Sequence, residues 1–139
     1  MGDNPFVGRW TYRSLTNDPK LETAFNALEF GRATIEFVDA PMEILAGTIG
    51  GTGWSLKLQG SREYGTPMRA RFQGTGTINN ETWIYNYEGW LVPHWPDGVA
   101  QQPAIVGSVI RTKQHAGSQP GSISPAGVVA SFYAVREAS

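Results

Sequence analysis

The feature that most constrains the fold of this chain is an alternation of apolar and polar residues that recurs along its length. It is clearest in residues 68–77, where Met68, Ala70 and Phe72 alternate with charged and polar residues. Because successive side chains of a strand point to opposite faces, this pattern predicts a strand with one buried and one solvated face. The chain holds eight strand-like runs between turn sequences, at residues 6–14, 28–38, 42–49, 54–60, 68–77, 82–92, 104–112 and 128–137.

Short turn sequences join most of these runs and favour antiparallel hairpins. Residues 50–53 are a glycine-rich hairpin signal, and Asn79-Asn80 suits the positive φ values of a two-residue turn. Residues 19–27 are expected to form a short helical turn at best. Eight strands joined in this way can close on themselves, which removes exposed sheet edges. We therefore predict an all-β fold, an eight-stranded antiparallel meander barrel that forms one domain over residues 1–139.

Charge and composition argue against several classes of partner and chemistry. Eleven Lys and Arg against 12 Asp and Glu give a net charge of -1, and no polybasic run is present, so we expect neither nucleic acid nor a membrane surface as a partner. No apolar run approaches the roughly 18 residues of a membrane span and residues 1–5 lack signal-peptide features, so we expect a cytoplasmic protein. With no Cys and two distant His, we expect no thiol chemistry, metal or other cofactor.

Gly8-Arg9-Trp10, near the start of the first run, resembles the Gly-X-Trp motif of the calycin superfamily, which includes lipocalins and avidins. In that superfamily the tryptophan of the first strand seals the floor of the barrel and packs near a basic residue of the last strand. Arg136 stands where this partner would be, so the resemblance implies structural roles for Trp10 and Arg136. The lipocalin disulfides are missing, and Tyr12 replaces the asparagine of the avidin biotin site, so neither family is assigned.

If Trp10 seals the floor, the opposite end of the barrel is its mouth. Small residues at inward positions, such as Gly31, Ala33, Gly74 and Gly76, predict a hollow along the second and fifth runs. We therefore predict a protein that binds a small apolar or aromatic molecule. The alternative is that the mouth aromatics fill the barrel. The residues expected to line the mouth and hold the ligand are Tyr12, Ser14, Trp54, Trp83, Tyr85 and Arg111.

A second hypothesis is a small barrel enzyme of isomerase or cyclase type, in which Tyr85, Glu88 or His94 moves protons, with Tyr12 and Arg111 as further candidates. Glu88 can point inward only if Tyr85 points outward, because the two positions have opposite parity. His94 precedes Asp97 by three residues and could be an oriented base, or it could belong to a proline-flanked turn. The second histidine, His115, lies at the predicted mouth, in the Gly-, Ser- and Pro-rich residues 113–127, which we expect to be mobile. It could reach a ligand there, but we favour a solvated loop histidine.

The last three runs carry apolar residues on both faces, which a barrel wall facing solvent should not do. A second layer, such as a subunit interface, would cover the outer apolar side chains. We therefore predict a homo-oligomer, a dimer or higher, that associates through residues 82–92, 104–112 and 128–137. A third hypothesis is an oligomeric structural module that binds no ligand.

Overall fold

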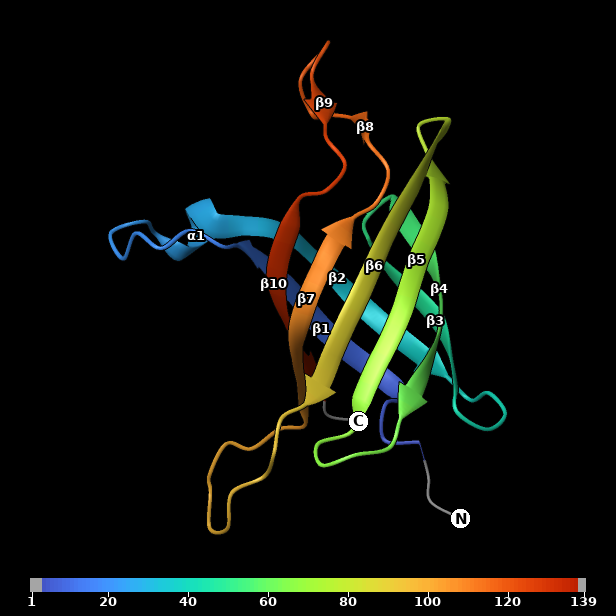
Figure 1. Ribbon diagram of the computed structural model, residues 1–139, viewed down its shortest axis with the longest axis vertical. Helices are drawn as coiled ribbons and strands as arrows, with labels where there is room; N and C mark the ends of the chain where they lie inside the picture. The colour runs from blue at the N-terminus through green and yellow to red at the C-terminus, as the bar shows by residue number, and fades with distance from the viewer. Residues whose placement is uncertain (1–3, 138–139) are drawn as a thin grey trace.

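Eight strands hydrogen-bond in a closed ring in the computed structural model, which describes residues 4–137 (Figure 1). Each strand pairs antiparallel with the strands next to it in sequence, and β10 closes the ring by pairing with β7 and β1. The prediction of an all-β, eight-stranded meander barrel is confirmed. Its strands are β1 (Gly8–Thr16), β2 (Glu29–Val38), β3 (Ile44–Gly51), β4 (Trp54–Glu63), β5 (Arg69–Ile78), β6 (Glu81–Leu91), β7 (Ala104–Arg111) and β10 (Val129–Arg136).

Three small elements lie outside the barrel wall, at one end of the barrel. Helix α1 (Phe25–Leu28) lies between β1 and β2, and β8 (His115–Ala116) pairs with β9 (Ile123–Ser124) between β7 and β10. Figure 1 shows both excursions at the same end as the β3–β4 and β5–β6 turns. No helix in the described part of the chain is long and apolar enough to cross a membrane.

The tight turns follow from residues that tolerate positive φ. Asn79 and Asn80 have φ values of 52° and 66°, and they join β5 to β6 where Ile78 pairs with Glu81. In the β3–β4 hairpin, Gly53 has a φ of 80°. All three φ values lie in the left-handed region, which is typical of tight hairpin turns. The two predicted hairpins are confirmed.

Glycines inside two strands allow neighbouring backbones to approach closely. A Cβ at Gly60 would lie 1.9 Å from the carbonyl oxygen of Arg71, and one at Gly107 would lie 1.9 Å from that of Glu88. Any side chain there would collide with the adjacent strand. Glycines at such positions let strands bend as a sheet curls into a barrel.

Inward side chains fill most of the barrel. Their burial shows which face points inward in the strands that are apolar on both sides. The fully buried or nearly buried residues include Leu45 and Ile49 on β3, Tyr85 and Tyr87 on β6, Ile105 and Val109 on β7, and Phe132 on β10. Phe72 stacks on Tyr87 with ring centroids 4.8 Å apart. The lower and central parts of the barrel are therefore a packed core.

The predicted hollow along the fifth strand is wrong. A Cβ at Gly74 would lie 3.3 Å from side-chain atoms of both Leu58 and Tyr87, and one at Gly76 would lie 3.0 Å from the Leu56 side chain. Large side chains of neighbouring strands therefore occupy the space that the small residues leave. The small residues of β5 make room for the core and not for a ligand.

The floor of the barrel joins the first strand to the last. Trp10 pairs with Arg136 in the β1–β10 register and is fully buried. Its indole Nε1 donates a hydrogen bond to the Phe6 carbonyl oxygen at 2.9 Å, and the Arg136 guanidinium carbon lies 5.7 Å from the ring centroid. Arg136 Nη1 also donates to the Pro5 carbonyl oxygen at 3.3 Å. The closed barrel and this arrangement are consistent with a calycin-like architecture.

Candidate functional site

A cavity of about 130 Å³ lies at the mouth, the end opposite Trp10. Gly31 and Ala33 of β2, which pair with Ser14 and Tyr12 of β1, are the smallest residues that line it. The predicted hollow therefore exists along the second strand alone. Five of the six residues predicted to bind ligand line this cavity: Tyr12, Ser14, Trp54, Trp83 and Tyr85.

Two polar groups of the cavity lining are buried without a hydrogen-bond partner among the described residues, the Ser14 hydroxyl oxygen and the Trp83 indole nitrogen. Ser14 is fully buried. Leaving a buried polar group unsatisfied costs about 1–3 kcal/mol, and native proteins rarely do so without a water or ligand to complete the bonding. These two groups can therefore hydrogen-bond to a water or a ligand in the cavity.

Tyr85 is the centre of a chain of hydrogen bonds at the rim. Arg111 Nε lies 3.0 Å from the Tyr85 hydroxyl, which lies 2.9 Å from His115 Nε2, and His115 Nδ1 lies 2.9 Å from the Ala116 carbonyl oxygen. Arginine can only donate and a carbonyl can only accept, so with a neutral imidazole His115 Nδ1 carries the proton and donates to Ala116. Tyr85 then accepts from Arg111 and donates to His115 Nε2.

His115 closes one side of the mouth. Its ring stacks on Trp83 with centroids 3.6 Å apart and planes 7° apart, and only 5% of the residue is exposed. The expectation of a solvated histidine in a mobile loop is wrong, because the β8–β9 pair brings residue 115 back over β6. Sequence reasoning placed His115 at the mouth, but it did not predict the contact with Tyr85, since no periodicity in residues 113–127 connects the two residues.

Arg111, the sixth predicted ligand-binding residue, stands at the rim next to the cavity. It pairs with Tyr85 in the β6–β7 register. Its guanidinium carbon lies 4.9 Å from the Phe30 ring centroid and 5.6 Å from that of Tyr85, and both rings line the cavity. Nη1 donates to the Pro125 carbonyl oxygen at 3.2 Å. Within residues 4–137, no carboxylate forms an ion pair with Arg111.

The deeper tyrosines are uncharged groups. Burial raises the pKa of Tyr12 well above its usual range, and the Ser14 hydroxyl lies near enough to oppose this rise in part, although it forms no hydrogen bond of normal geometry with Tyr12. Burial also raises the pKa of Tyr87 well above its usual range, with a smaller contribution in the same direction from Tyr12. Desolvation of a phenolate is the dominant cause in both cases. Tyr12 and Tyr87 therefore remain protonated at neutral pH and can act only as neutral hydrogen-bonding groups.

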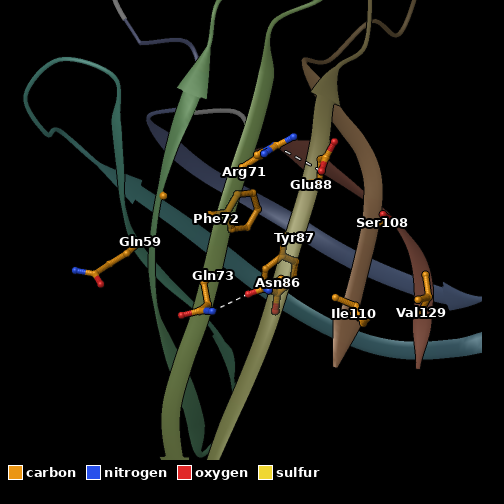
Figure 2. A pocket seen from close by; sticks show the side chains of 11 residues that line it. Gln59, Arg71, Phe72, Gln73, Asn86, Tyr87, Glu88, Ser108, Ile110 and Val129 are labelled. Atoms are coloured by element: carbon orange, nitrogen blue, oxygen red, sulfur yellow. Dashed lines mark hydrogen bonds and ion pairs between the residues drawn. The ribbon is translucent and has the colours of Figure 1, made fainter. Parts of the chain in front are cut away.

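Glu88 lies on the outer wall, so its inward orientation is ruled out. Tyr85 and Tyr87 are the buried positions of β6, which sends Glu88 outward by strand alternation. Figure 2 shows Glu88 beside a shallow hollow of about 570 Å³ on this wall, where its carboxylate lies 3.6 Å from Arg71. Gln73 and Asn86 also bond to each other there, at 2.8 Å. This larger hollow contains polar side chains that already satisfy one another.

His94 lies at the floor end, in the exposed loop between β6 and β7. No hydrogen bond joins the His94 and Asp97 side chains in the described chain. Asp97 has a φ of 60° and Gly98 N donates to the Trp95 carbonyl oxygen at 3.1 Å, so the segment is a turn. The three catalytic candidates Tyr85, Glu88 and His94 thus lie at the mouth, on the outer wall and near the floor. They do not form one site.

Two further findings bear on the chemistry of the site. Within residues 4–137, no group of three or more His, Cys, Asp or Glu is placed to hold a metal ion. Comparisons of the chain with family models, with curated proteins and with solved structures found no match.

Proposed function

We propose that this barrel binds a small apolar or aromatic molecule in the cavity at its mouth. The observation that carries the proposal is a cavity with two buried polar groups, on Ser14 and Trp83, that have no partner within the described chain. A void of about 150 Å³ is enough to hold a benzene ring. The cavity at the mouth, of about 130 Å³, is close to that size, so we propose one ring or a short aliphatic group as its occupant.

The architecture supports the same proposal. Eight-stranded barrels are just wide enough either to be filled by side chains or to hold one small ligand, as lipocalins and streptavidin do. Here the floor is filled around Trp10, while Gly31 and Ala33 leave space at the mouth. A calycin-like barrel with a sealed floor and a lined mouth is the form we propose.

A cavity-filling substitution tests the binding site. Ala33→Leu adds volume inside the cavity, whereas Ala46→Leu adds the same volume on the outer face of β3, a neighbouring strand in the same wall. Single-ring probes such as toluene, phenol and benzamide are titrated against both variants and the wild type, and binding is followed by chemical-shift changes of the Trp indole protons. We expect Ala33→Leu to abolish binding and Ala46→Leu to retain it. Equal binding by all three proteins, or no binding by the wild type, contradicts the proposal.

A catalytic function of isomerase or cyclase type is the second candidate, and the position of Tyr85 between Arg111 and His115 favours it. A hydroxyl held by a cation and an imidazole can exchange its proton with a bound molecule. The test is exchange of the α-hydrogens of acetophenone in deuterated water, followed by proton NMR. We expect faster exchange with wild type than with Tyr85→Phe, and equal rates exclude this function.

We also propose that a second copy of the chain covers the outer face of β6, β7 and β10. Trp90, Val106 and Tyr133 are direct cross-strand neighbours on this face and are 37%, 43% and 40% exposed. Exposed apolar rows of this kind are typical of interaction surfaces. Val106→Lys should then convert a dimer to a monomer in analytical ultracentrifugation, while Ala46→Lys on the distant wall should not. A monomeric wild type rejects the association.

A further inference from the structure

We infer that the ligand of the mouth cavity is a small aromatic carboxylate, and that Arg111 binds its carboxylate group. The inference rests on the proposed ligand-binding function and adds the charge of the ligand to it. Three observations carry it: the unpaired charge of Arg111, an excess of hydrogen-bond donors at the rim, and the position of the guanidinium beside the cavity.

The first observation is that Arg111 has only neutral partners within the described chain. It bonds to the Tyr85 hydroxyl and the Pro125 carbonyl oxygen and lies over the Phe30 ring. Five other arginines contact a glutamate carboxylate: Arg9, Arg13, Arg32, Arg69 and Arg71.

The carboxylates nearest to the mouth are already engaged. Glu29 lies 2.8 Å from Arg32 and 3.7 Å from Arg13, and Glu81 accepts a hydrogen bond from the Ala116 amide at 3.0 Å. Neither glutamate forms an ion pair with Arg111. Arg111 therefore keeps a positive charge that no ion pair within the described residues neutralises, and an anion would bind there favourably.

The second observation is an excess of donors over acceptors. A guanidinium carries five N–H groups, and the two hydrogen bonds of Arg111 leave three of them available. The unpartnered Trp83 indole nitrogen can also only donate. His115 Nε2, an acceptor at the rim, is occupied by Tyr85. A carboxylate, which only accepts, complements this set of groups, whereas an ammonium group does not.

The third observation places the charge next to the apolar space. The Arg111 guanidinium lies over Phe30 and beside Tyr85, which both line the cavity. Ala33 and Ile49 also line it. A carboxylate bound at Arg111 would project its body past these rings into about 130 Å³ of space. That volume suits a single ring, so benzoate is the probe that matches both parts of the site.

Benzoate and benzamide test the charge, because they have nearly the same shape and differ by one negative charge. Both are titrated by calorimetry against wild type, Arg111→Gln, Arg111→Lys and the control Arg9→Gln, which removes an equal charge on the outer wall near the floor. We expect wild type to prefer benzoate by about tenfold to a hundredfold, as charge-assisted hydrogen bonds give. Arg111→Gln should lose this preference, while Arg111→Lys and Arg9→Gln should retain most of it.

Each outcome separates the inference from the proposed function. Equal binding of benzoate and benzamide by wild type overturns the carboxylate assignment and leaves the ligand-binding function standing. A benzoate preference that survives in Arg111→Gln overturns the role of Arg111. If no single-ring probe binds, the proposed function itself fails. Should Arg111→Gln not fold, Arg111→Lys and salt dependence carry the test, because high salt must weaken benzoate and spare benzamide.

Discussion

The two ends of this barrel contain the same kinds of residue in different states of completion. At the floor, Trp10 and Arg136 both donate to main-chain carbonyl oxygens, those of Phe6 and Pro5. At the mouth, Trp83 has an indole nitrogen without a partner in the described chain. The two arginines make similar bonds, since Arg111 donates to the Pro125 carbonyl oxygen, so the two ends differ in whether the tryptophan nitrogen has a partner.

The difference arises from what covers each end. The N-terminal segment before β1 brings buried Phe6 onto Trp10, so the floor is closed by chain that continues directly into the first strand. The mouth is covered by the β8–β9 excursion, which contacts the barrel through the His115 ring, the Ala116 amide and the Pro125 carbonyl oxygen. Contacts of an excursion open more easily than those of chain that continues directly into a strand. The floor is therefore covered by chain that is continuous with β1, and the mouth by a separate excursion between β7 and β10.

The largest loss of stability should come from truncating Trp10, the tryptophan at the floor. Trp10→Ala is expected to lower the free energy of unfolding by about 3–5 kcal/mol, because it empties a fully buried site and removes the bond to Phe6. Trp83→Ala should lower the free energy of unfolding by clearly less, since Trp83 is only partly buried and its indole nitrogen has no partner in the described chain. Urea denaturation measures both values. Equal losses would mean that the two ends contribute alike and would break the comparison.

High pH should reveal how dry the centre of the barrel is between the two ends. Burial raises the pKa of Tyr12 and Tyr87 above the usual value of 10.0, so above about pH 10 the unfolded chain loses protons that the folded chain retains. The free energy of unfolding should therefore fall as pH rises above 10, by up to about 1.4 kcal/mol per pH unit for each tyrosine. Urea denaturation at a series of pH values measures the slope.

Phenylalanine variants isolate the contribution of these tyrosines. Tyr12→Phe should remove part of the alkaline loss of stability, and the double variant Tyr12→Phe with Tyr87→Phe should remove more. A slope that is the same in the double variant and in the wild type would show that other groups cause it. It would also indicate that water reaches the phenols through the mouth, against the picture of a dry barrel centre.

Removing a single polar group should change the free energy of unfolding by a smaller amount, and the sign of the change should differ between the mouth and the floor. Ser14→Ala is expected to leave the free energy of unfolding unchanged or to raise it by about 1 kcal/mol, because the hydroxyl is buried without a partner. Trp10→Phe should lower it, because it leaves the Phe6 carbonyl oxygen without its donor. Thermal and urea unfolding decide the signs. A destabilising Ser14→Ala would mean that the hydroxyl is already satisfied.

The alternation of residues was sufficient to predict the strands, their order and three of the residues around the cavity, Tyr12, Ser14 and Trp54. Tyr12 and Ser14 follow directly from the parity of Trp10 on the first strand, and the antiparallel meander places them opposite the floor. Parity failed to decide β6, because Ile84, Tyr85 and Trp90 are all apolar or aromatic, and a shift of one residue exchanges the two faces. Only neighbouring strands decide that Tyr85 points in and Glu88 out.

Two features depend on packing that no local pattern encodes. Gly74 indicates space on its own strand, but whether that space stays empty depends on the lengths of Leu58 and Tyr87 on adjacent strands. His115 reaches Tyr85 across 30 positions of sequence, through a segment with no strand periodicity. Arg111 could be expected at the mouth from its strand, but its lack of a carboxylate partner is a property of the whole rim.

The smallest expected change in global stability tests whether His115 fastens the cover of the mouth. His115→Ala should lower the free energy of unfolding by less than about 1 kcal/mol, because the excursion of residues 113–127 contributes little to the core. Amide hydrogen exchange in those residues should nevertheless become faster, since the stack on Trp83 and the bond from Tyr85 are both lost. Exchange in the segment before β1 should be unchanged and serves as the internal control. Unaltered exchange in residues 113–127 would mean that main-chain bonds such as that from Gly127 N to the Arg111 carbonyl oxygen hold the cover, which would make the mouth as firmly closed as the floor.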